Sequence, residues 1–147
     1  MDPICITAYS DAAHRGKVIS LWRGVFGYET AHNKPEVAID KKVGFGDELF
    51  FVANEADEVI GTVMAGYDGH RGWIYSVAVS AAHRRRGVGS QLVEFAEAAL
   101  AKKGCMKVNL QILEGNETVT AFYESLGFAV EKRVSMGKRI PENIPAD

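Results

Sequence analysis

The chain has 147 residues, of which 47% are hydrophobic and 24% are charged, and its formal net charge is -2. This length suits one compact domain, and the composition is ordinary for a soluble globular protein and argues against disorder. No apolar stretch approaches the length of a membrane span, and the first residues lack the basic and apolar regions of a signal peptide. We therefore expect one cytoplasmic domain over residues 1–147, with a loose tail at 140–147 and no membrane partner.

Cysteine and histidine usage predicts neither a disulfide nor a metal site. Cys5 and Cys105 have strand-like neighbours and no CxxC spacing, so we expect two reduced, largely buried thiols. The histidines are scattered and lack metal-ligand spacing. They are His14, His32, His70 and His83. The near-neutral charge also argues against nucleic acid as a partner, because that partner requires a broad basic face.

The chain begins with a predicted strand and helix. Residues 5–9 have strand character, and Ser10 or Asp11 can cap the helix that follows. The helix has one apolar face, because four residues recur at helical spacing. They are Val18, Leu21, Trp22 and Val25.

A second helix and three strands are predicted next. After a loop at 27–35, Asn33 can cap a helix that starts near Pro35. Its apolar residues are Val37, Ile39 and Val43. The strands are predicted at 48–55, 59–67 and 73–80. The turns between them are short and the second contains Asp-Gly, which predicts an antiparallel meander.

The hydrophobic period then changes to that of a helix over 88–103, which Gly104 can end. The apolar face of this helix comprises Val88, Leu92, Phe95, Ala96, Ala99 and Leu100. A strand at 107–113 follows, and then a helix capped by Asn116 and closed by Gly127. The apolar face of that last helix comprises Val119, Phe122, Tyr123 and Leu126.

Two final strands are expected at 128–133 and 135–140. The element order is then β-α-α-β-β-β-α-β-α-β-β. It predicts an α+β fold with a mixed, mostly antiparallel sheet of about seven strands and four helices. The unit from Trp73 to Leu113 should place two strands parallel, with a right-handed crossover.

The segment RRRGVGS concentrates positive charge and small residues where a helix begins. The first N–H groups of a helix have no partner within it, and together with the helix dipole they bind anions. Glycines leave these groups accessible, and arginines add fork-shaped donors that match phosphate. The residues of this predicted pyrophosphate cradle are Arg84, Arg85, Arg86, Gly87, Val88, Gly89 and Ser90.

A solvated loop at the three arginines followed by a tight turn at the glycines explains the same residues, and this short motif alone does not decide between the two interpretations. Two other phosphate motifs fit poorly. The segment lacks the lysine of a P-loop and the third glycine of the dinucleotide fingerprint.

The segment VAVSAAHRRRGVGSQLVEFAEAAL resembles the acetyl-CoA-binding motif of the GCN5-related N-acetyltransferases, the GNAT family. Arg84, Gly87 and Gly89 occupy its defining positions. Downstream, NETVTAFYESLGF resembles a second family segment. Its matching residues are Asn116, Tyr123, Gly127 and Phe128. The resemblance covers nearly the whole chain and implies a GNAT-like fold that is splayed between strands 4 and 5.

The resemblance implies an enzyme that moves an acetyl group from acetyl-CoA to a primary amine. Backbone groups of the strand before the cradle would bind the pantetheine arm. They belong to Val77, Ala78 and Val79. A backbone N–H near Val77 would stabilise the developing oxyanion. Val77 to Val79 can equally be an ordinary buried strand.

The resemblance also implies three roles in the last helix. Tyr123 matches the general acid of the family, and a phenol with a pKa of about 10 is protonated at neutral pH. Asn116 would contact the pantetheine arm, and Phe122 would pack against the cofactor or the core. From the residues alone, Tyr123 can be a packing residue and Asn116 a simple helix cap.

The acceptor and the general base are less defined. The acceptor would be a small molecule or a peptide amine, and the protein a monomer or homodimer. Candidate acceptor-binding residues are Tyr28, Asp68, His70, Trp73 and Tyr75, with Trp22, Phe26 and Arg71 as further possible lining residues. The strand before the cradle carries no acid, and Gln111 stands where some protein N-terminal acetyltransferases have Glu. Available carboxylates are Glu29, Glu48, Asp68 and Glu114, and ordered water assisted by Tyr75 or Ser76 is the alternative.

Two other functions compete with the enzyme. The missing strand acid favours a non-catalytic acyl-CoA-binding sensor or regulatory module, whereas Tyr123 argues against it. A nucleic-acid binder that used the arginines would show affinity that collapses with salt.

Overall fold

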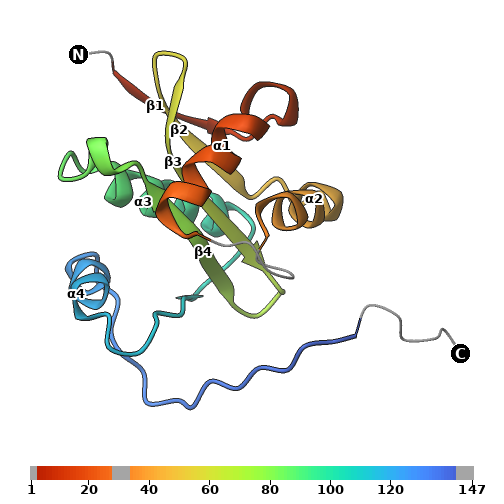
Figure 1. Cartoon of the computed structure of the whole chain (residues 1–147). Coiled ribbons are helices and arrows are strands. Elements are labelled where there is room, and N and C mark those ends of the chain that lie inside the picture. Colours follow the sequence, from red (N-terminus) through yellow and green to blue (C-terminus); the bar gives the residue numbers. More distant parts are fainter. Residues whose placement is uncertain (1–2, 28–33, 142–147) are drawn as a thin grey trace, which may run out of the picture. The chain divides into compact units, whose positions relative to one another are not determined.

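The computed structural model describes residues 3–27 and 34–141. The chain divides into two compact units, residues 1–111 and 112–147. The first unit contains β1 (Ile4–Ala8), α1 (Asp11–Val25), α2 (Pro35–Phe45), β2 (Phe50–Glu55), β3 (Glu58–Tyr67), β4 (Gly72–Val79), the short 3-10 helix η2 (Ala81–His83), α3 (Val88–Lys102) and β5 (Val108–Asn109) (Figure 1). The second unit contains α4 (Glu117–Ser125).

The strands form one mixed sheet of five strands in the order β1-β2-β3-β4-β5. The strands β2, β3 and β4 are antiparallel neighbours, which confirms the predicted meander of three strands. β1 extends it by pairing antiparallel with β2. The pairing of β4 with β5 is parallel, also as predicted. It consists of two residue pairs, Gly72 with Val108 and Trp73 with Asn109.

The prediction of about seven strands is wrong. Within the described residues, 128–141 contain no strand, and β5 has two residues where the sequence predicted 107–113. A strand exists only where a neighbouring strand accepts its hydrogen bonds. The sequence pattern of a segment shows a local preference for the extended conformation, but it does not show whether a neighbouring strand is available.

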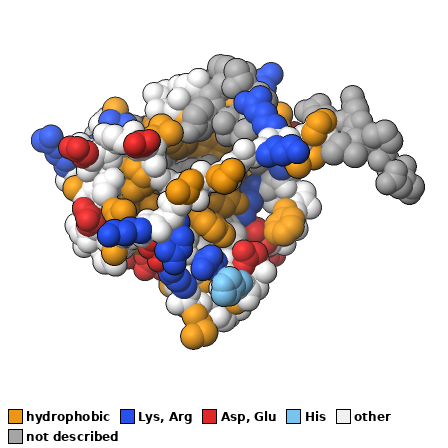
Figure 2. Space-filling view, turned by 90° about the horizontal axis from the view of Figure 1, so that it is seen from below, with side chains coloured by type: hydrophobic (Ala, Val, Ile, Leu, Met, Phe, Trp, Pro, Cys, Tyr) orange, Lys and Arg blue, Asp and Glu red, His pale blue; other side chains and the backbone are white. Residues whose placement is uncertain are grey.

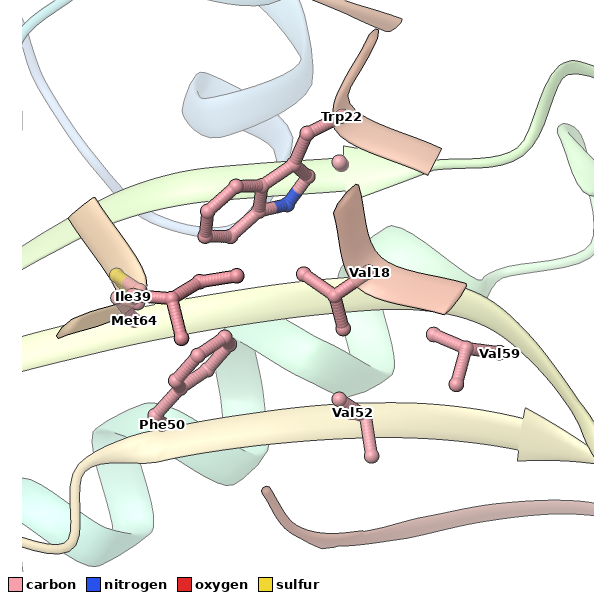
Figure 3. Close-up of a cluster of buried hydrophobic side chains, with 8 residues drawn as sticks. Val18, Trp22, Ile39, Phe50, Val52, Val59 and Met64 are labelled. Carbon is pink, nitrogen blue, oxygen red and sulfur yellow. The ribbon is translucent and has the colours of Figure 1, made fainter. Parts of the chain in front are cut away.

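The sheet is covered on both faces, with α1 and α2 on one side and α3 on the other (Figure 1). The core below α1 and α2 is drawn in Figure 3, where side chains from the two helices meet those of the strands. Its buried members are Val18, Trp22, Ile39, Phe50, Val52, Val59, Met64 and Ala78. On the opposite face, the buried residues of α3 are Val88, Leu92, Val93, Ala96 and Leu100. No helix in the described part of the chain is both long and apolar enough to span a membrane.

Three predicted core positions are more exposed than expected. Val43 on α2 is 48% exposed, whereas the neighbouring Lys42 is buried. Phe95 on α3 is 40% exposed, although its ring packs edge-on against Phe51. Cys5 is exposed because β1 lies at the edge of the sheet; it and the half-buried Cys105 are free thiols.

Lys42 is buried because two oxygens receive its ammonium group. Its Nζ lies 2.8 Å from Oδ2 of Asp47 and also donates to the carbonyl of Ala65 on β3. The same ammonium lies 5.3 Å from the ring centroid of Tyr75 on β4. These contacts tie the end of α2 to the sheet and satisfy the buried charge.

Gly61 on β3 allows α3 to pack closely on the sheet. A Cβ at this position would lie 2.8 Å from Cδ1 of Leu92 and 3.0 Å from the carbonyl oxygen of Ala78. The Leu92 side chain is fully buried, so it has little room to move. The glycine is therefore required by packing between the helix and the strand.

We predict that Gly61→Ala lowers the free energy of unfolding by about 1–3 kcal/mol, because overpacking forces α3 away from β3. Gly16→Ala is the matched control, since no atom lies within 4 Å of a Cβ there. In the middle of α1, that change should raise stability by up to about 1 kcal/mol. Urea unfolding measures both, and a Gly61→Ala protein as stable as wild type would contradict the packing account.

Candidate functional site

The connection from β4 to α3 is built from unusual backbone conformations. Arg85 has φ 65° and Gly87, the residue before α3, has φ 75°. Glycine adopts this left-handed region freely, whereas arginine does so at a cost. A Cβ at Gly87 would meet no atom within 4 Å, so the conformation of the backbone, and not crowding by the protein, explains this glycine.

The first turn of α3 presents backbone donors. Gly87 is the cap residue and provides no side-chain acceptor. The first helical hydrogen bond runs from the N–H of Gln91 to the carbonyl of Gly87, at 3.1 Å. The N–H groups of Val88, Gly89 and Ser90 precede that bond, so the helix offers them no acceptor. Together with the helix dipole, such free donors favour an anion at this end of the helix. The cradle itself stays a prediction.

The three arginines of the cradle have different environments. Arg86 donates to Oε2 of Glu55 at the end of β2 and forms an ion pair with it. The other oxygen of Glu55 lies 3.4 Å from Nε2 of His83. Arg86 therefore fastens the loop to the sheet, a role that the sequence did not suggest. The guanidinium of Arg86 lowers the pKa of Glu55 below its usual range.

Arg84 and Arg85 are the exposed members of the cluster, and neither forms an ion pair with the described residues. Arg84 lines a groove of about 930 Å³ that also borders α1 and the turn between β2 and β3. Both guanidinium groups are accordingly available to an anionic ligand.

The strand β4 contains a bulge that the sequence analysis missed. Thr62 pairs with Ala78, but two residues further along β3, Met64 pairs with Tyr75, so β4 holds one extra residue. Ser76 within this bulge has φ 52°. No local sequence signal marks the bulge, because serine seldom takes this conformation.

The predicted pantetheine-binding residues follow the bulge. Ala78 is buried, whereas Val77 and Val79 are half-buried. The pairing of β4 with β5 ends at Trp73, so within the described chain no strand partners this stretch on that side. An extended ligand can therefore bind its backbone groups.

The predicted acceptor-binding residues lie along the other end of β4 and the turn before it. Asp68 shapes that turn, since its Oδ1 accepts the N–H groups of Arg71 and His70 at 2.7 Å each. These hydrogen bonds lower the pKa of the Asp68 carboxyl. Trp73 and Tyr75 follow on the strand, and Tyr75 is 42% exposed.

Three other sequence predictions, at Tyr28, Glu29 and Asn33, concern positions outside the described residues.

The second unit contains the remaining predicted site residues. The Oδ1 of Asn116 accepts the N–H of Val119 at 3.3 Å, so Asn116 caps α4 as expected. The ring of Tyr123 packs edge-on against those of Phe122 and Phe128, at centroid distances of 4.9 and 5.6 Å. Burial raises the pKa of the Tyr123 phenol, so the group is protonated at neutral pH.

The surface carries both signs of charge. In Figure 2, acidic side chains lie among the basic ones, with hydrophobic groups between them. In the part of the chain that the structure describes, no group of three or more His, Cys, Asp or Glu side chains could hold a metal ion.

Comparison with known proteins gives one family. The model of the Acetyltransferase (GNAT) family matches residues 12–128. Acetyltransferase SG1711 of Sodalis glossinidius (strain morsitans) is 38% identical over 128 residues, which cover 86% of this chain and 89% of that protein.

Solved structures share the fold. The aminoglycoside N-acetyltransferase AAC(6')-Iy in complex with CoA has a TM-score of 0.78 at 19% identity, with 95% of this chain and 96% of that chain covered. Glucosamine-6-phosphate N-acetyltransferase from Arabidopsis thaliana has a TM-score of 0.69 at 23% identity, with 95% and 100% covered. At these identities the likeness concerns the fold alone. The match to the family model and the 38% identity to the Sodalis acetyltransferase are stronger evidence. They establish that the chain belongs to the GNAT family of acetyltransferases.

Proposed function

We propose that this protein is an acetyl-CoA-dependent N-acetyltransferase that acts on a primary amine. The observation that carries the proposal is the first turn of α3, where the amides of Val88, Gly89 and Ser90 lack helical acceptors and no side chain caps them. Membership of the family and a structural neighbour bound to CoA support the same ligand.

The residues of the cradle fit the diphosphate of coenzyme A. The amides of the first turn and the exposed Arg84 and Arg85 supply donors and positive charge. Arg86 contributes less directly, because Glu55 already holds its guanidinium. The backbone of Val77 to Val79 would bind the pantetheine arm, with Asn116 and Phe122 as the further contacts that the family resemblance implies.

The thioester supplies an acyl group that an amine nitrogen can attack. A C–N bond forms, the C–S bond breaks, the amine gives up a proton and the sulfur gains one. We assign stabilisation of the carbonyl oxygen to the N–H of Val77, whose strand conformation is set by the bulge at Ser76. We assign the proton for the sulfur to Tyr123, because its raised pKa keeps the phenol protonated.

The acceptor is proposed to be a small-molecule or peptide amine. Two structural neighbours act, by their names, on an aminoglycoside and on glucosamine 6-phosphate, but at their identities they do not identify the acceptor of this chain. Asp68 is a poor candidate for the general base, since the amides of Arg71 and His70 lower its pKa and weaken it as a base. The remaining proposed route for the amine proton is ordered water assisted by Tyr75 or Ser76, and no residue is assigned as the general base. The cytoplasmic location stays a prediction.

Release of free thiol from acetyl-CoA, measured over a panel of amines, tests the proposed function. We expect amine-dependent release that follows Michaelis–Menten kinetics in both substrates. If acetyl-CoA raises the melting temperature but no amine gives turnover, the protein is the non-catalytic acyl-CoA-binding module. If neither acetyl-CoA nor CoA changes the melting temperature, both functions are wrong.

We predict that Tyr123→Phe lowers kcat by about a hundredfold or more, because the leaving sulfur loses its proton donor. The Kd for acetyl-CoA should change little, since the ring and its contacts with Phe122 and Phe128 are kept. Tyr67→Phe is the matched control. Among the described residues, the hydroxyl of Tyr67 hydrogen-bonds only to the backbone carbonyls of Gly69 and Gly104. Equal kcat values for Tyr123→Phe and wild type would remove Tyr123 from the mechanism.

A further inference from the structure

A buried chain of two hydrogen bonds connects α1 to the bulge of β4. The indole N–H of Trp22 donates to Oγ1 of Thr62 at 2.8 Å, and Oγ1 of Thr62 donates to the carbonyl oxygen of Ser76 at 2.9 Å. Thr62 is fully buried and Trp22 is 3% exposed. Figure 3 shows the Trp22 indole against the strands, with its nitrogen in blue.

The direction of both hydrogen bonds is fixed by the chemistry of the two ends. An indole nitrogen can only donate, and a carbonyl oxygen can only accept. The Thr62 hydroxyl must therefore accept from Trp22, and its single proton is left for Ser76. Trp22 thus occupies one lone pair of the hydroxyl and favours the orientation in which its proton meets the Ser76 carbonyl.

The carbonyl that accepts the hydrogen bond from Thr62 belongs to Ser76, whose backbone conformation is exceptional in β4. Ser76 has φ 52°, a left-handed conformation that is unfavourable for residues other than glycine. Neither Ser76 nor Val77 has a paired residue in the register of β4 with β3. The pairing of the sheet does not hold this peptide, so another interaction must do so.

The carbonyl of Ser76 and the N–H of Val77 belong to the same peptide group. The structure has no cis peptide among the described residues, so this group is planar and trans, and its C=O and N–H bonds point in opposite directions. Because Thr62 on β3 holds the carbonyl oxygen, the N–H of Val77 is directed away from β3.

We propose that Thr62 and Trp22 are positioning residues, which hold the Ser76–Val77 peptide so that the Val77 N–H points away from β3. The catalytic part of this inference rests on the proposed function, in which that N–H stabilises the oxyanion. The structural part, that the hydroxyl of Thr62 maintains the bulge, does not depend on any activity.

Two variants of Thr62 separate the hydroxyl from the shape of the side chain. Thr62→Val keeps the volume and removes the hydroxyl, and Thr62→Ser keeps the hydroxyl. Thr7→Val is the matched control, because it removes a strand hydroxyl that accepts from Asn54 in an exposed part of β1. Trp22→Phe is a further test should Thr62→Val fold poorly, since it removes the N–H that orients the hydroxyl.

The structural readout is the intraresidue Hα–HN nuclear Overhauser effect of Ser76, which is strong when φ is positive. We expect a strong signal in wild type, Thr62→Ser and Thr7→Val, a weak one in Thr62→Val and a reduced one in Trp22→Phe. If Thr62→Val folds and retains the full signal, the hydroxyl does not hold the bulge. If Trp22→Phe folds and retains it, Trp22 does not orient that hydroxyl. Either result overturns the proposal.

The kinetic readout tests the catalytic part. Thr62→Val should lower kcat by about ten- to a hundredfold, because a misdirected donor loses most of its effect on the transition state. The KM for acetyl-CoA should stay within about twofold, because the cradle at α3 is untouched. Thr62→Ser should restore kcat, and Thr7→Val should leave it unchanged. Equal losses in Thr62→Val and Thr62→Ser would show a packing effect and overturn the proposal.

The two readouts also distinguish this proposal from the proposed function. If wild type turns over no amine, the catalytic part falls with the proposed function, and the Ser76 signal alone decides the structural part. If wild type is active and Thr62→Val loses the Ser76 signal but keeps kcat, acetyl transfer stands and the role of the Val77 N–H is refuted.

Discussion

The first turn of α3 exposes backbone N–H groups that the helix cannot satisfy, and the site depends on how these groups are presented. Gly87 reaches the required left-handed conformation without strain and brings no capping side chain. Glu55 fixes the preceding loop by holding Arg86 and contacting His83. The positive end of the helix is thereby left open to an anion, with the exposed Arg84 and Arg85 beside it.

The main chain provides the second functional element as well. The bulge in β4 turns a peptide out of the regular ladder, and a buried hydroxyl on β3 holds that peptide by its carbonyl. In both places the backbone is the proposed ligand-binding group, and a side chain from another strand of the sheet fixes that backbone. Glu55 and Thr62 have this supporting role, although neither belongs to a recognisable ligand-binding motif.

The sequence predicted those features that depend on local chemistry. The helix over 88–103 and the Asn116 cap were found because periodicity and capping act within a few residues. The strands at 128–133 and 135–140 were wrong because a strand depends on a partner that the pattern does not name. The bulge at Ser76 and the burial of Lys42 were missed because hydrogen-bond partners distant in the sequence determine them.

The most direct test of the account is a titration of the isotope-labelled protein with coenzyme A, followed through the backbone amide resonances of Val88, Gly89 and Ser90. The account predicts large, saturable shifts of these amides with CoA and much smaller ones with pantetheine, which lacks the diphosphate. Saturable binding of CoA that leaves these three amides unshifted would contradict it.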